Sequence, residues 1–383
     1  MLPRKYSIVK QRVKKIEGVG SSMKILISDK LAKEGVEILE AVEDFTVDCR
    51  FGITSDELKS VIKDYDGLII RSATHVTSDV LDSADCLKVI GRAGVGLDNI
   101  DLKAATKKGV VAMNTPSGNT TSTAEHTMSM ILALSRNIPQ ACASMKAGSW
   151  DRSKFSGVEL HGKKLGIVGF GRIGSTVAKF AKSFGMEILA YDPFLSIEVA
   201  AKQGVSMVEL SDLLREADYI TIHIPKSAET KNLISHKEFD VIKKSARVIN
   251  CARGGIVDEQ ALVVALQENK IAGCALDVYE QEPLSSDSPL LSFDNCILTP
   301  HLGASTSEAQ VNVAIEIAET VRDALLGKGI SNAANFPSVD AEAYKILEPY
   351  IRAWRTLFNS LTTFGSSSSV RCIPRDQILT STG

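Results

Sequence analysis

Short apolar runs alternate with amphipathic segments of helix length through most of this chain, and this alternation restricts the fold more than any other feature. Strands joined by helices form βαβ units, in which the strands lie parallel. The runs with strand character are residues 24–28, 67–71, 88–92, 110–114, 164–168, 187–191, 219–224, 246–250, 273–278 and 296–299. The last six are enough for a complete dinucleotide-binding sheet. The sequence therefore predicts an α/β fold with two parallel sheets.

Two long segments with helical spacing are expected to connect the sheets. Residues 118–145 begin with Thr and Ser and carry apolar residues at helical intervals, which predicts one long helix that bridges two domains. The segment after Ser305 has the spacing of a capping box, from Ser305 to Glu308, and predicts a helix that returns to the first domain. The expected division is a first domain over residues 23–118 and 305–334, interrupted by a second over residues 119–304.

The two ends of the chain do not follow the alternating pattern. Residues 1–22 are basic and lack the apolar stretch of a secretory signal, so they are either an organelle-targeting leader or an extension ahead of a start at Met23. We favour the extension, because a strand pattern begins directly after Met23. From residue 335 onward the periodicity fades into a Gly/Ser tract, and residues 335–383 are expected to be a truncated or unstructured tail.

Composition excludes several classes of function. A chain of 383 residues can bury two cores, and its formal net charge of −2 leaves no broad basic field for a nucleic acid. No apolar run approaches the roughly 20 residues that span a bilayer, so no membrane partner is expected. The seven cysteines are scattered, without a C-x-x-C pair, which argues against a disulfide framework or a metal site. A reducing compartment, the cytoplasm, is the expected location.

One glycine motif predicts a dinucleotide site. It reads Gly169-Phe170-Gly171-Arg172-Ile173-Gly174, follows the strand at 164–168 and opens a helix expected at 175–184. Backbone N–H groups at such a helix start meet the pyrophosphate, with Arg172 beside it. Asp192 ends the next strand, where a carboxylate accepts both ribose hydroxyls. Because a carboxylate repels a 2′-phosphate, NAD is preferred over NADP.

Three polar clusters follow later strands of the same sheet, beginning at Asn250, Asp277 and Pro300. Oxidation of a 2-hydroxy acid requires a base for the hydroxyl proton and a cation for the carboxylate. His301 suits the base, because imidazole titrates near neutral pH. Glu282 would orient that imidazole, and Arg253 would grip the carboxylate with its planar fork of donors. Each of the three alone is more often a surface residue, whereas their order at strand ends favours a site.

These motifs resemble those of a known family. V-G-F-G-R-I-G is followed in order by N-C-A-R-G-G-I-V-D-E, A-L-D-V-Y-E-Q-E-P and P-H-L-G-A-S-T, and together they resemble the D-isomer-specific 2-hydroxyacid dehydrogenases over about residues 23–337. The resemblance implies two Rossmann-like doubly wound lobes, with an NAD-binding domain inserted into a flavodoxin-like substrate-binding domain, in a homodimer or homotetramer. It also implies that Arg253, Glu282 and His301 form the catalytic set.

The cofactor contacts follow from the same resemblance. Apart from the glycine motif and Asp192, the residues expected to contact NAD are Val95, His223, Ile224, Pro225, Cys251, Ala252, Arg253, Asp277, His301, Gly303 and Ala304. Cys251 lacks a paired base and is expected to pack rather than react. His126 lies in the bridging helix and is expected to be structural.

Substrate choice is expected to lie in the first domain. Arg71 and Arg92 both follow apolar strands, and two arginines facing the cleft suit a phosphate group. Asn119 lies in a stretch that resembles the branch of the family acting on phosphoglycerate, and would help to hold substrate. The expected reaction is NAD-dependent oxidation of D-3-phosphoglycerate to 3-phosphohydroxypyruvate, at the start of serine biosynthesis.

Three alternatives remain open from the residues. A glyoxylate, hydroxypyruvate or D-lactate reductase shares all three catalytic positions. An NAD-sensing regulator of the corepressor type keeps the same fold. The two arginines could also form ordinary surface ion pairs.

Overall fold

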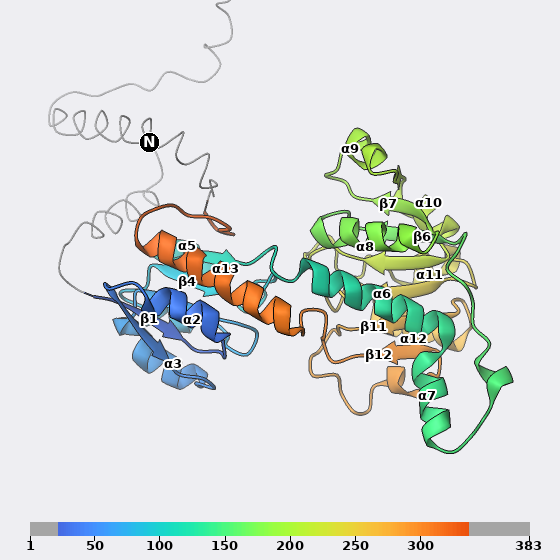
Figure 1. The fold of residues 1–383 in the computed structure, drawn as a ribbon, viewed down its shortest axis with the longest axis horizontal. Coiled ribbons are helices and arrows are strands. Elements are labelled where there is room, and N and C mark those ends of the chain that lie inside the picture. The colour runs from blue at the N-terminus through green and yellow to red at the C-terminus, as the bar shows by residue number, and fades with distance from the viewer. Residues whose placement is uncertain (1–21, 337–383) are drawn as a thin grey trace, which may run out of the picture.

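The computed structural model describes residues 22–336, which form two lobes placed side by side (Figure 1). We refer to the lobe with strands β1–β5 as the small lobe and to the lobe with strands β6–β12 as the large lobe. The extension expected over residues 1–22 and the tail expected over 335–383 lie outside the described residues, except for Ser22, Asn335 and Phe336.

The small lobe is built on a five-stranded parallel sheet in the order β2-β1-β3-β4-β5. Its strands are β1 (Met23–Ile27), β2 (Phe45–Cys49), β3 (Gly67–Ile70), β4 (Val89–Arg92) and β5 (Val111–Asn114). Its helices are α2 (Lys33–Glu40), α3 (Ser55–Val61), α4 (Ser78–Asp82) and α5 (Leu102–Lys108), with a short 3₁₀ turn η2 (Ile62–Asp64). This is the flavodoxin-like strand order, in which the chain reverses direction across the sheet between β1 and β3.

Both faces of the small sheet are covered by helices, as a parallel sheet requires. Successive strand side chains point to opposite faces. Ile25 and Ile27 therefore pack on one side, in the core formed with α2 and α13 (Ser307–Leu325), while Leu26 packs on the other side against α3 and α4. All three are fully buried, and each contributes about 1.5–3 kcal/mol of transfer free energy.

The large lobe holds a seven-stranded parallel sheet in the order β12-β11-β10-β9-β6-β7-β8. Its strands are β6 (Lys164–Val168), β7 (Glu187–Tyr191), β8 (Ser206–Met207), β9 (Tyr219–Ile222), β10 (Arg247–Asn250), β11 (Gly273–Leu276) and β12 (Cys296–Leu298). The helices are α6 (Thr120–Arg136), α7 (Ile138–Lys146), α8 (Arg172–Ser183), α9 (Ile197–Lys202), α10 (Leu210–Glu216), α11 (His236–Val241) and α12 (Glu259–Gln267). Two 3₁₀ turns complete it, η3 (Arg152–Phe155) and η4 (Pro289–Ser292).

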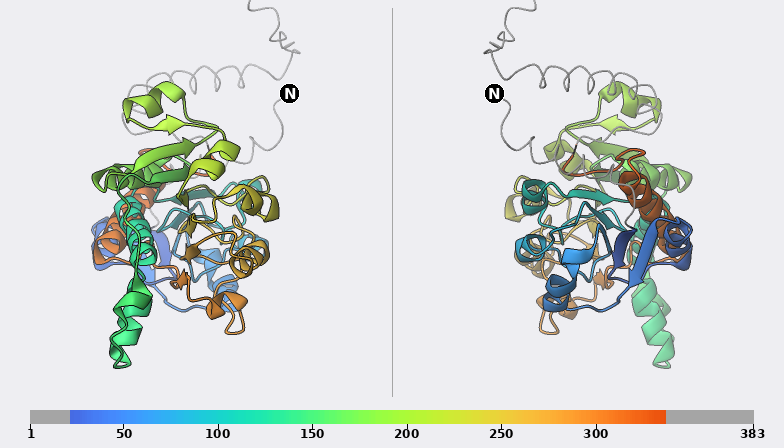
Figure 2. Two further views of the ribbon diagram at one scale, coloured as in Figure 1. Left: turned by 90° about the vertical axis from the view of Figure 1, so that its right-hand side faces the viewer. Right: turned by 90° about the vertical axis from the view of Figure 1, so that its left-hand side faces the viewer.

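The large sheet is also buried on both faces. One core lies between the sheet and α6 and α8, and contains Ile167 and Ile249; the other lies under α10, α11 and α12, and contains Ile220 and Val248. The fold prediction of two doubly wound lobes is confirmed. Figure 2 shows the two sheets from either end of the molecule.

Two strands were not expected from the sequence. β2 is an edge strand, and most of its side chains are partly or fully exposed. β8 is an edge strand of only two residues. Edge strands with few buried side chains lack the continuous apolar run that identified the central strands.

The single long helix expected over residues 118–145 is wrong. The structure has two helices, α6 and α7, which meet at Asn137. Asn137 adopts a left-handed conformation with φ of 53°, and Pro139 in the first turn of α7 cannot donate the hydrogen bond that would continue α6. α7 therefore leaves the body of the lobe and projects from it (Figure 2).

Two helix starts also differ from expectation. α8 begins at Arg172, inside the glycine motif, rather than at residue 175. The capping box expected from Ser305 to Glu308 is wrong, because the N-cap of α13 is Thr306, whose hydroxyl accepts a hydrogen bond from the Ala309 N–H. α13 nonetheless packs on the small lobe, with Val313, Ile317 and Val321 in its core.

The chain thus crosses between the lobes after β5 and again before α13 (Figure 1). On this basis we propose that the small lobe corresponds to residues 23–118 and 305–334 and the large lobe to residues 119–304. No helix within residues 22–336 has the length and apolar character needed to cross a bilayer.

Candidate active site

The glycine motif lies at the point where the large sheet reverses direction, between β6 and β9. In open α/β sheets this is where ligands bind. Gly169 has φ of 94°, which a side chain rarely adopts, and a Cβ there would lie 2.5 Å from Ile224 Cγ2. A Cβ on Gly174 would lie 2.2 Å from the Gly169 carbonyl oxygen, whereas no atom of the described chain lies within 4 Å of one on Gly171. The motif is packed on one side and open on the other.

The start of α8 and Asp192 face the same opening. Within residues 22–336 no side chain caps α8, so its first N–H groups are available to an anion. The Asp192 carboxylate, directly after β7, accepts hydrogen bonds from the Phe170 N–H and the Phe194 N–H, both at 2.9 Å. The structure therefore brings the predicted ribose carboxylate against the glycine motif. Arg172 and Ile173 stand in the first turn of α8.

The remaining predicted cofactor residues follow neighbouring strands. His223, Ile224 and Pro225 come directly after β9, beside β6. Burial lowers the pKa of His223, and its neutral ring shares a hydrogen bond with Thr221. Cys251 and Ala252 come directly after β10.

The Cys251 thiol packs within the core of the large lobe. It is buried, and burial together with the Asp277 charge raises its pKa to about 12. It therefore remains protonated at neutral pH, in agreement with a packing role.

His301 and Glu282 form a direct pair. The Nδ1 atom of His301 lies 2.7 Å from Oε2 of Glu282, and both side chains are partly exposed, at 48% and 38%. Glu282 Oε1 accepts a hydrogen bond from the Tyr279 N–H, which fixes the carboxylate. The pair leaves Nε2 of His301 free to exchange a proton with a bound molecule.

Arg253 connects the two lobes. Its Nε donates to Oδ2 of Asp98 in the small lobe at 2.9 Å, and its Nη1 donates to the Ala252 carbonyl. Asn250 supports the turn by donating to the Arg253 carbonyl and accepting from the Ala252 N–H. The remaining guanidinium donors of Arg253 are left for a ligand.

Arg71 and Arg92 lie on the small-lobe side of the same region. Arg71 follows β3 at the point where the small sheet reverses direction, and its Nη1 donates to the Lys30 carbonyl. Burial lowers the pKa of Arg92, and the positive charges of Arg253 and Arg71 contribute to the same shift, to about 10. Three arginine charges therefore act on one another at the boundary between the lobes.

These two arginines are not surface ion pairs. Within residues 22–336 neither Arg71 nor Arg92 forms a salt bridge, and the buried Nε of Arg92 has no hydrogen-bond partner there. The buried side-chain oxygen of Asn119 also lacks a partner in the described part of the chain. Unpaired buried polar atoms are rare in folded proteins, and a bound ligand is one partner that would satisfy these two.

The other predicted residues have protein partners. The Val95 carbonyl accepts a hydrogen bond from the Asn114 side chain, and the Ala304 carbonyl accepts one from Gln310. Asp277 is completely buried, and its carboxylate accepts hydrogen bonds from the Leu302 and Gly303 N–H groups.

Sequence reasoning did not select two carboxylates of this region. Asp98 pairs with Arg253, and buried Asp29 accepts hydrogen bonds from the Arg71 N–H and from both donors of Thr74. Both aspartates follow strands or glycine turns at the same sheet edge, which is the signal that could have identified them. Among residues 22–336, no group of three His, Cys, Asp or Glu side chains is arranged to hold a metal ion.

Comparison with known proteins gives a consistent result. The sequence model described as "D-isomer specific 2-hydroxyacid dehydrogenase, NAD binding domain" matches residues 128–303. D-3-phosphoglycerate dehydrogenase from Synechocystis sp. is 49% identical over 334 residues, which is 87% of this chain and 60% of that protein. The enzyme of the same name from Methanocaldococcus jannaschii is 48% identical over 330 residues, covering 86% and 62%. The chain thus spans about three fifths of these relatives.

One solved structure has a similar fold and is matched over the whole of its own length. D-lactate dehydrogenase from Aquifex aeolicus, complexed with NAD and lactic acid, superposes with a TM-score of 0.73 and 30% identity, covering 82% of this chain and 100% of that one. Together with the strand order and the ordered motifs, these matches establish that the chain belongs to the D-isomer-specific 2-hydroxyacid dehydrogenase family.

Proposed function

We propose that this protein oxidises D-3-phosphoglycerate to 3-phosphohydroxypyruvate with NAD, as the first step of serine biosynthesis. The observation that carries the proposal is the cluster of Arg71, Arg92 and Arg253 at the lobe boundary. Asp98 is the one carboxylate that pairs with any of them in a salt bridge within residues 22–336. A substrate with a carboxylate at one end and a phosphate at the other supplies the missing negative charge.

The described residues divide the chemistry between them. Arg253 binds the carboxylate and polarises the oxygen on C2 as a carbonyl develops there. Nε2 of His301 accepts the hydroxyl proton, while Glu282 holds the Nδ1–H and stabilises the imidazolium that forms. Arg71, Arg92 and Asn119 hold the rest of the substrate.

The glycine motif, the uncapped start of α8 and the fixed Asp192 carboxylate fit a dinucleotide. Bound NAD would accept the hydride that leaves C2. The open space beside Gly171 allows the backbone to approach a pyrophosphate, and the α8 N–H groups would bind it.

Substrate specificity provides the first test. With NADH as reductant, we expect faster turnover of 3-phosphohydroxypyruvate than of hydroxypyruvate or glyoxylate, followed by loss of NADH absorbance. Arg71→Ala and Arg92→Ala should each raise KM for the phosphorylated substrate by about 10- to 100-fold, since one charge-assisted hydrogen bond of about 1.5–3 kcal/mol is lost. KM for hydroxypyruvate should hardly change.

Arg50→Ala is the matched control, because Arg50 is an exposed arginine beyond edge strand β2 whose salt bridge, within residues 22–336, is to Asp48. Equal losses on both substrates in the Arg71 and Arg92 variants would show that these arginines are structural. Faster turnover of glyoxylate by the parent would instead favour a reductase of unphosphorylated 2-oxo acids.

Cofactor choice is expected to depend on Asp192. Asp192→Ala should weaken the binding of NAD and improve the relative use of NADP, because it removes a carboxylate that would face the 2′-phosphate of NADP. Asp192→Asn keeps the shape and removes only the charge, so it should shift the preference in the same direction. The ratio of kcat/KM with the two cofactors measures the effect. Equal use of NAD and NADP by the parent would contradict the assignment.

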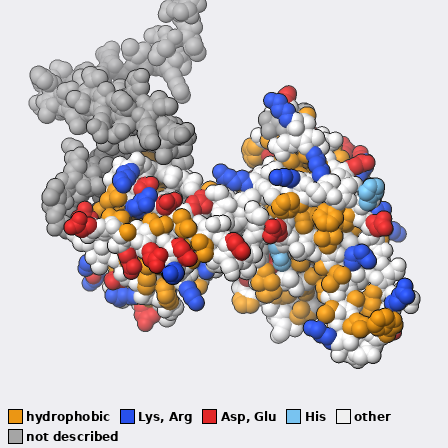
Figure 3. All heavy atoms as spheres, viewed as in Figure 1, with side chains coloured by type: hydrophobic (Ala, Val, Ile, Leu, Met, Phe, Trp, Pro, Cys, Tyr) orange, Lys and Arg blue, Asp and Glu red, His pale blue; other side chains and the backbone are white. Residues whose placement is uncertain are grey.

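We further propose that the protein is a homodimer or homotetramer in the cytoplasm. α7 has no buried residue, and apolar side chains are exposed on it and after it, namely Ile138, Met145 and Trp150. Figure 3 shows hydrophobic side chains gathered on the visible face of the large lobe. A second copy of the chain would cover such a surface.

All six cysteines within residues 22–336 are free thiols, which supports a reducing compartment.

A further inference from the structure

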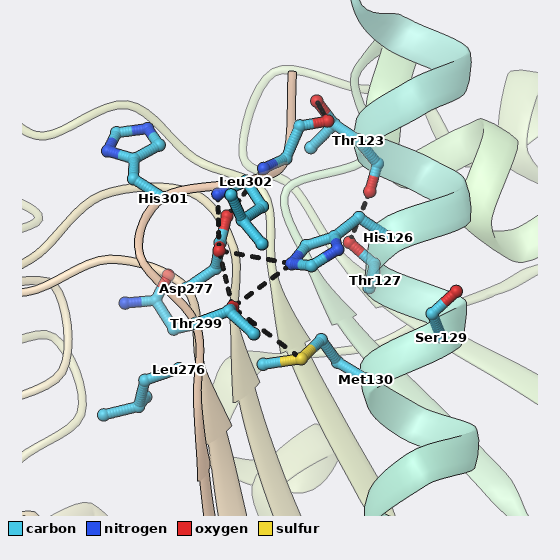
Figure 4. A network of polar contacts seen from close by, with 12 residues as sticks. Thr123, His126, Thr127, Ser129, Met130, Leu276, Asp277, Thr299, His301 and Leu302 are labelled. Atoms are coloured by element: carbon cyan, nitrogen blue, oxygen red, sulfur yellow. Dashed lines mark hydrogen bonds and ion pairs between the residues drawn. The ribbon is translucent and has the colours of Figure 1, made fainter. Parts of the chain in front are cut away.

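A buried polar network connects helix α6 to the segment that carries His301. Its centre is the Asp277 carboxylate, directly after β11 (Figure 4). We propose that His126 is a positioning residue, which holds His301 in its working place through Asp277 and Thr299. The proposal rests on the proposed function, because it requires His301 to be the catalytic base.

Three donors converge on one oxygen of Asp277. Oδ1 accepts from the Thr299 hydroxyl at 2.6 Å and from the Leu302 N–H at 2.7 Å, and it lies 3.2 Å from Nε2 of His126. Oδ2 accepts from the Gly303 N–H at 2.8 Å. Burial alone would raise the pKa of Asp277, but the hydrogen bonds from His126, Thr299 and Leu302 outweigh it and lower the pKa. Asp277 is thus an ionised anchor.

The network fixes the tautomer of His126. Nε2 of His126 also lies 3.3 Å from the Thr299 hydroxyl oxygen, whose single proton takes the 2.6 Å bond to Asp277 rather than the 3.9 Å contact with the Met130 sulfur. An ionised carboxylate can only accept, so Nε2 must carry the proton that it shares between the two oxygens. His126 is therefore a donor that orients both Asp277 and Thr299.

This anchor acts on the backbone on either side of His301. His301 has φ of 56°, a left-handed conformation that a residue with a side chain seldom adopts unless its surroundings impose it. The Leu302 and Gly303 N–H groups bound to Asp277 follow it directly, and Thr299 precedes it by two residues. The His301 ring points away from the network (Figure 4). The network thus restrains the backbone while the ring stays free to react.

Helix α6 holds the same segment at a second place. The hydroxyls of Ser122 and Thr123 donate to the Gly303 carbonyl at 2.8 and 3.2 Å. His126 lies one turn further along α6, so all three contacts come from the first half of the helix. α6 begins directly after the chain passes from the small lobe to the large lobe. Its contacts therefore hold the His301 segment close to the connection between the lobes.

His126 is not needed to hold α6 in the fold. The helix packs through its apolar side chains, among them Ala124, Met128 and Ile131, which are buried in the large-lobe core. His126 is partly buried, with 18% of its side chain exposed, and its contacts to Asp277 and Thr299 are polar. Loss of its donor should therefore displace the His301 segment more than it unfolds the protein.

The test compares variants that remove the donor with one that keeps a donor. His126→Phe fills the space without a donor, and we expect kcat to fall by about 10- to 100-fold, as a small misplacement of a catalytic group does. The melting temperature should remain close to the parent value, because Asp277 keeps its hydrogen bonds from Thr299, Leu302 and Gly303. His126→Gln keeps an N–H near the position of Nε2 and should restore most of kcat.

Thr299→Val removes the hydroxyl that donates to Asp277 and should lower kcat in the same way. Ser129→Ala is the matched control on α6, because in the described part of the chain the Ser129 hydroxyl donates to the Glu125 carbonyl of its own helix and not to the network. Unchanged kcat in His126→Phe would overturn the proposal, as would a loss of melting temperature parallel to kcat with no rescue by Gln. A parent without turnover of any 2-oxo acid would instead disprove the proposed function.

Discussion

Replacing His301 with alanine is expected to lower kcat by roughly 10²- to 10⁴-fold, the usual contribution of a positioned general base. His301 is the imidazole that pairs with Glu282, and Nε2 is its free nitrogen. Without it, the hydroxyl proton must leave to water, which is a weaker and unpositioned base. Binding of NAD should be largely retained, because the glycine motif after β6 and Asp192 after β7 supply the main contacts expected for the dinucleotide.

The measurement is steady-state kcat with the preferred substrate, together with the dissociation constant of NADH from fluorescence. His161→Ala serves as control, since His161 is an exposed histidine of the same lobe. Glu282→Gln keeps an acceptor for the Nδ1–H but loses the charge, so its effect should be smaller than that of His301→Ala. Turnover of His301→Ala close to the parent value would remove His301 from the mechanism.

Replacing Arg253 with alanine should lower kcat/KM by about 10²- to 10⁴-fold, since two charge-assisted hydrogen bonds of about 1.5–3 kcal/mol each are lost. Part of this loss should appear in kcat, because the guanidinium also polarises the developing carbonyl. Arg253→Lys keeps the charge but not the planar fork, and should recover only part of the activity.

The pair with Asp98 allows a specific control. Asp98→Asn removes the ion pair across the lobes and leaves Arg253 in place, so its effect on kcat/KM should be much smaller. Asp98 is 61% exposed, and such a pair contributes about 0–1 kcal/mol to stability, so the melting temperatures of both variants should stay near the parent value. If Asp98→Asn reproduced the full loss seen in Arg253→Ala, the role of Arg253 would be lobe contact rather than substrate binding.

Central strands and the glycine motif could be predicted because their signals are local. β6 reads as a continuous apolar run since helices cover both of its faces, and Gly169 is required by its own backbone angle and the adjacent Ile224. Asp192 could be placed for the same reason, because it ends the strand after the motif. The geometry of a βαβ unit follows from its sequence at short range.

The break at Asn137 and the cap at Thr306 show where local signals were ambiguous. Residues 118–145 carry helical spacing throughout, and the prediction gave this spacing more weight than Pro139, the local signal that ends α6 at Asn137. Ser305 and Thr306 both suit an N-cap, and in the structure the Thr306 hydroxyl is the one that accepts a hydrogen bond, from the Ala309 N–H.

The sequence by itself determined the class of fold, the cofactor motif and the three residue types of the candidate chemistry, since each depends on contiguous or ordered stretches of chain. Tertiary structure alone decided which charges meet. Arg253 pairs with Asp98, 155 residues away, and His126 reaches Asp277 across the large lobe. These pairs form because the parallel strands end at the same edge of each sheet and because α6 lies next to the connection between the lobes. Electrostatic and hydrogen-bond energies depend on distance in space, which spacing along the chain does not encode.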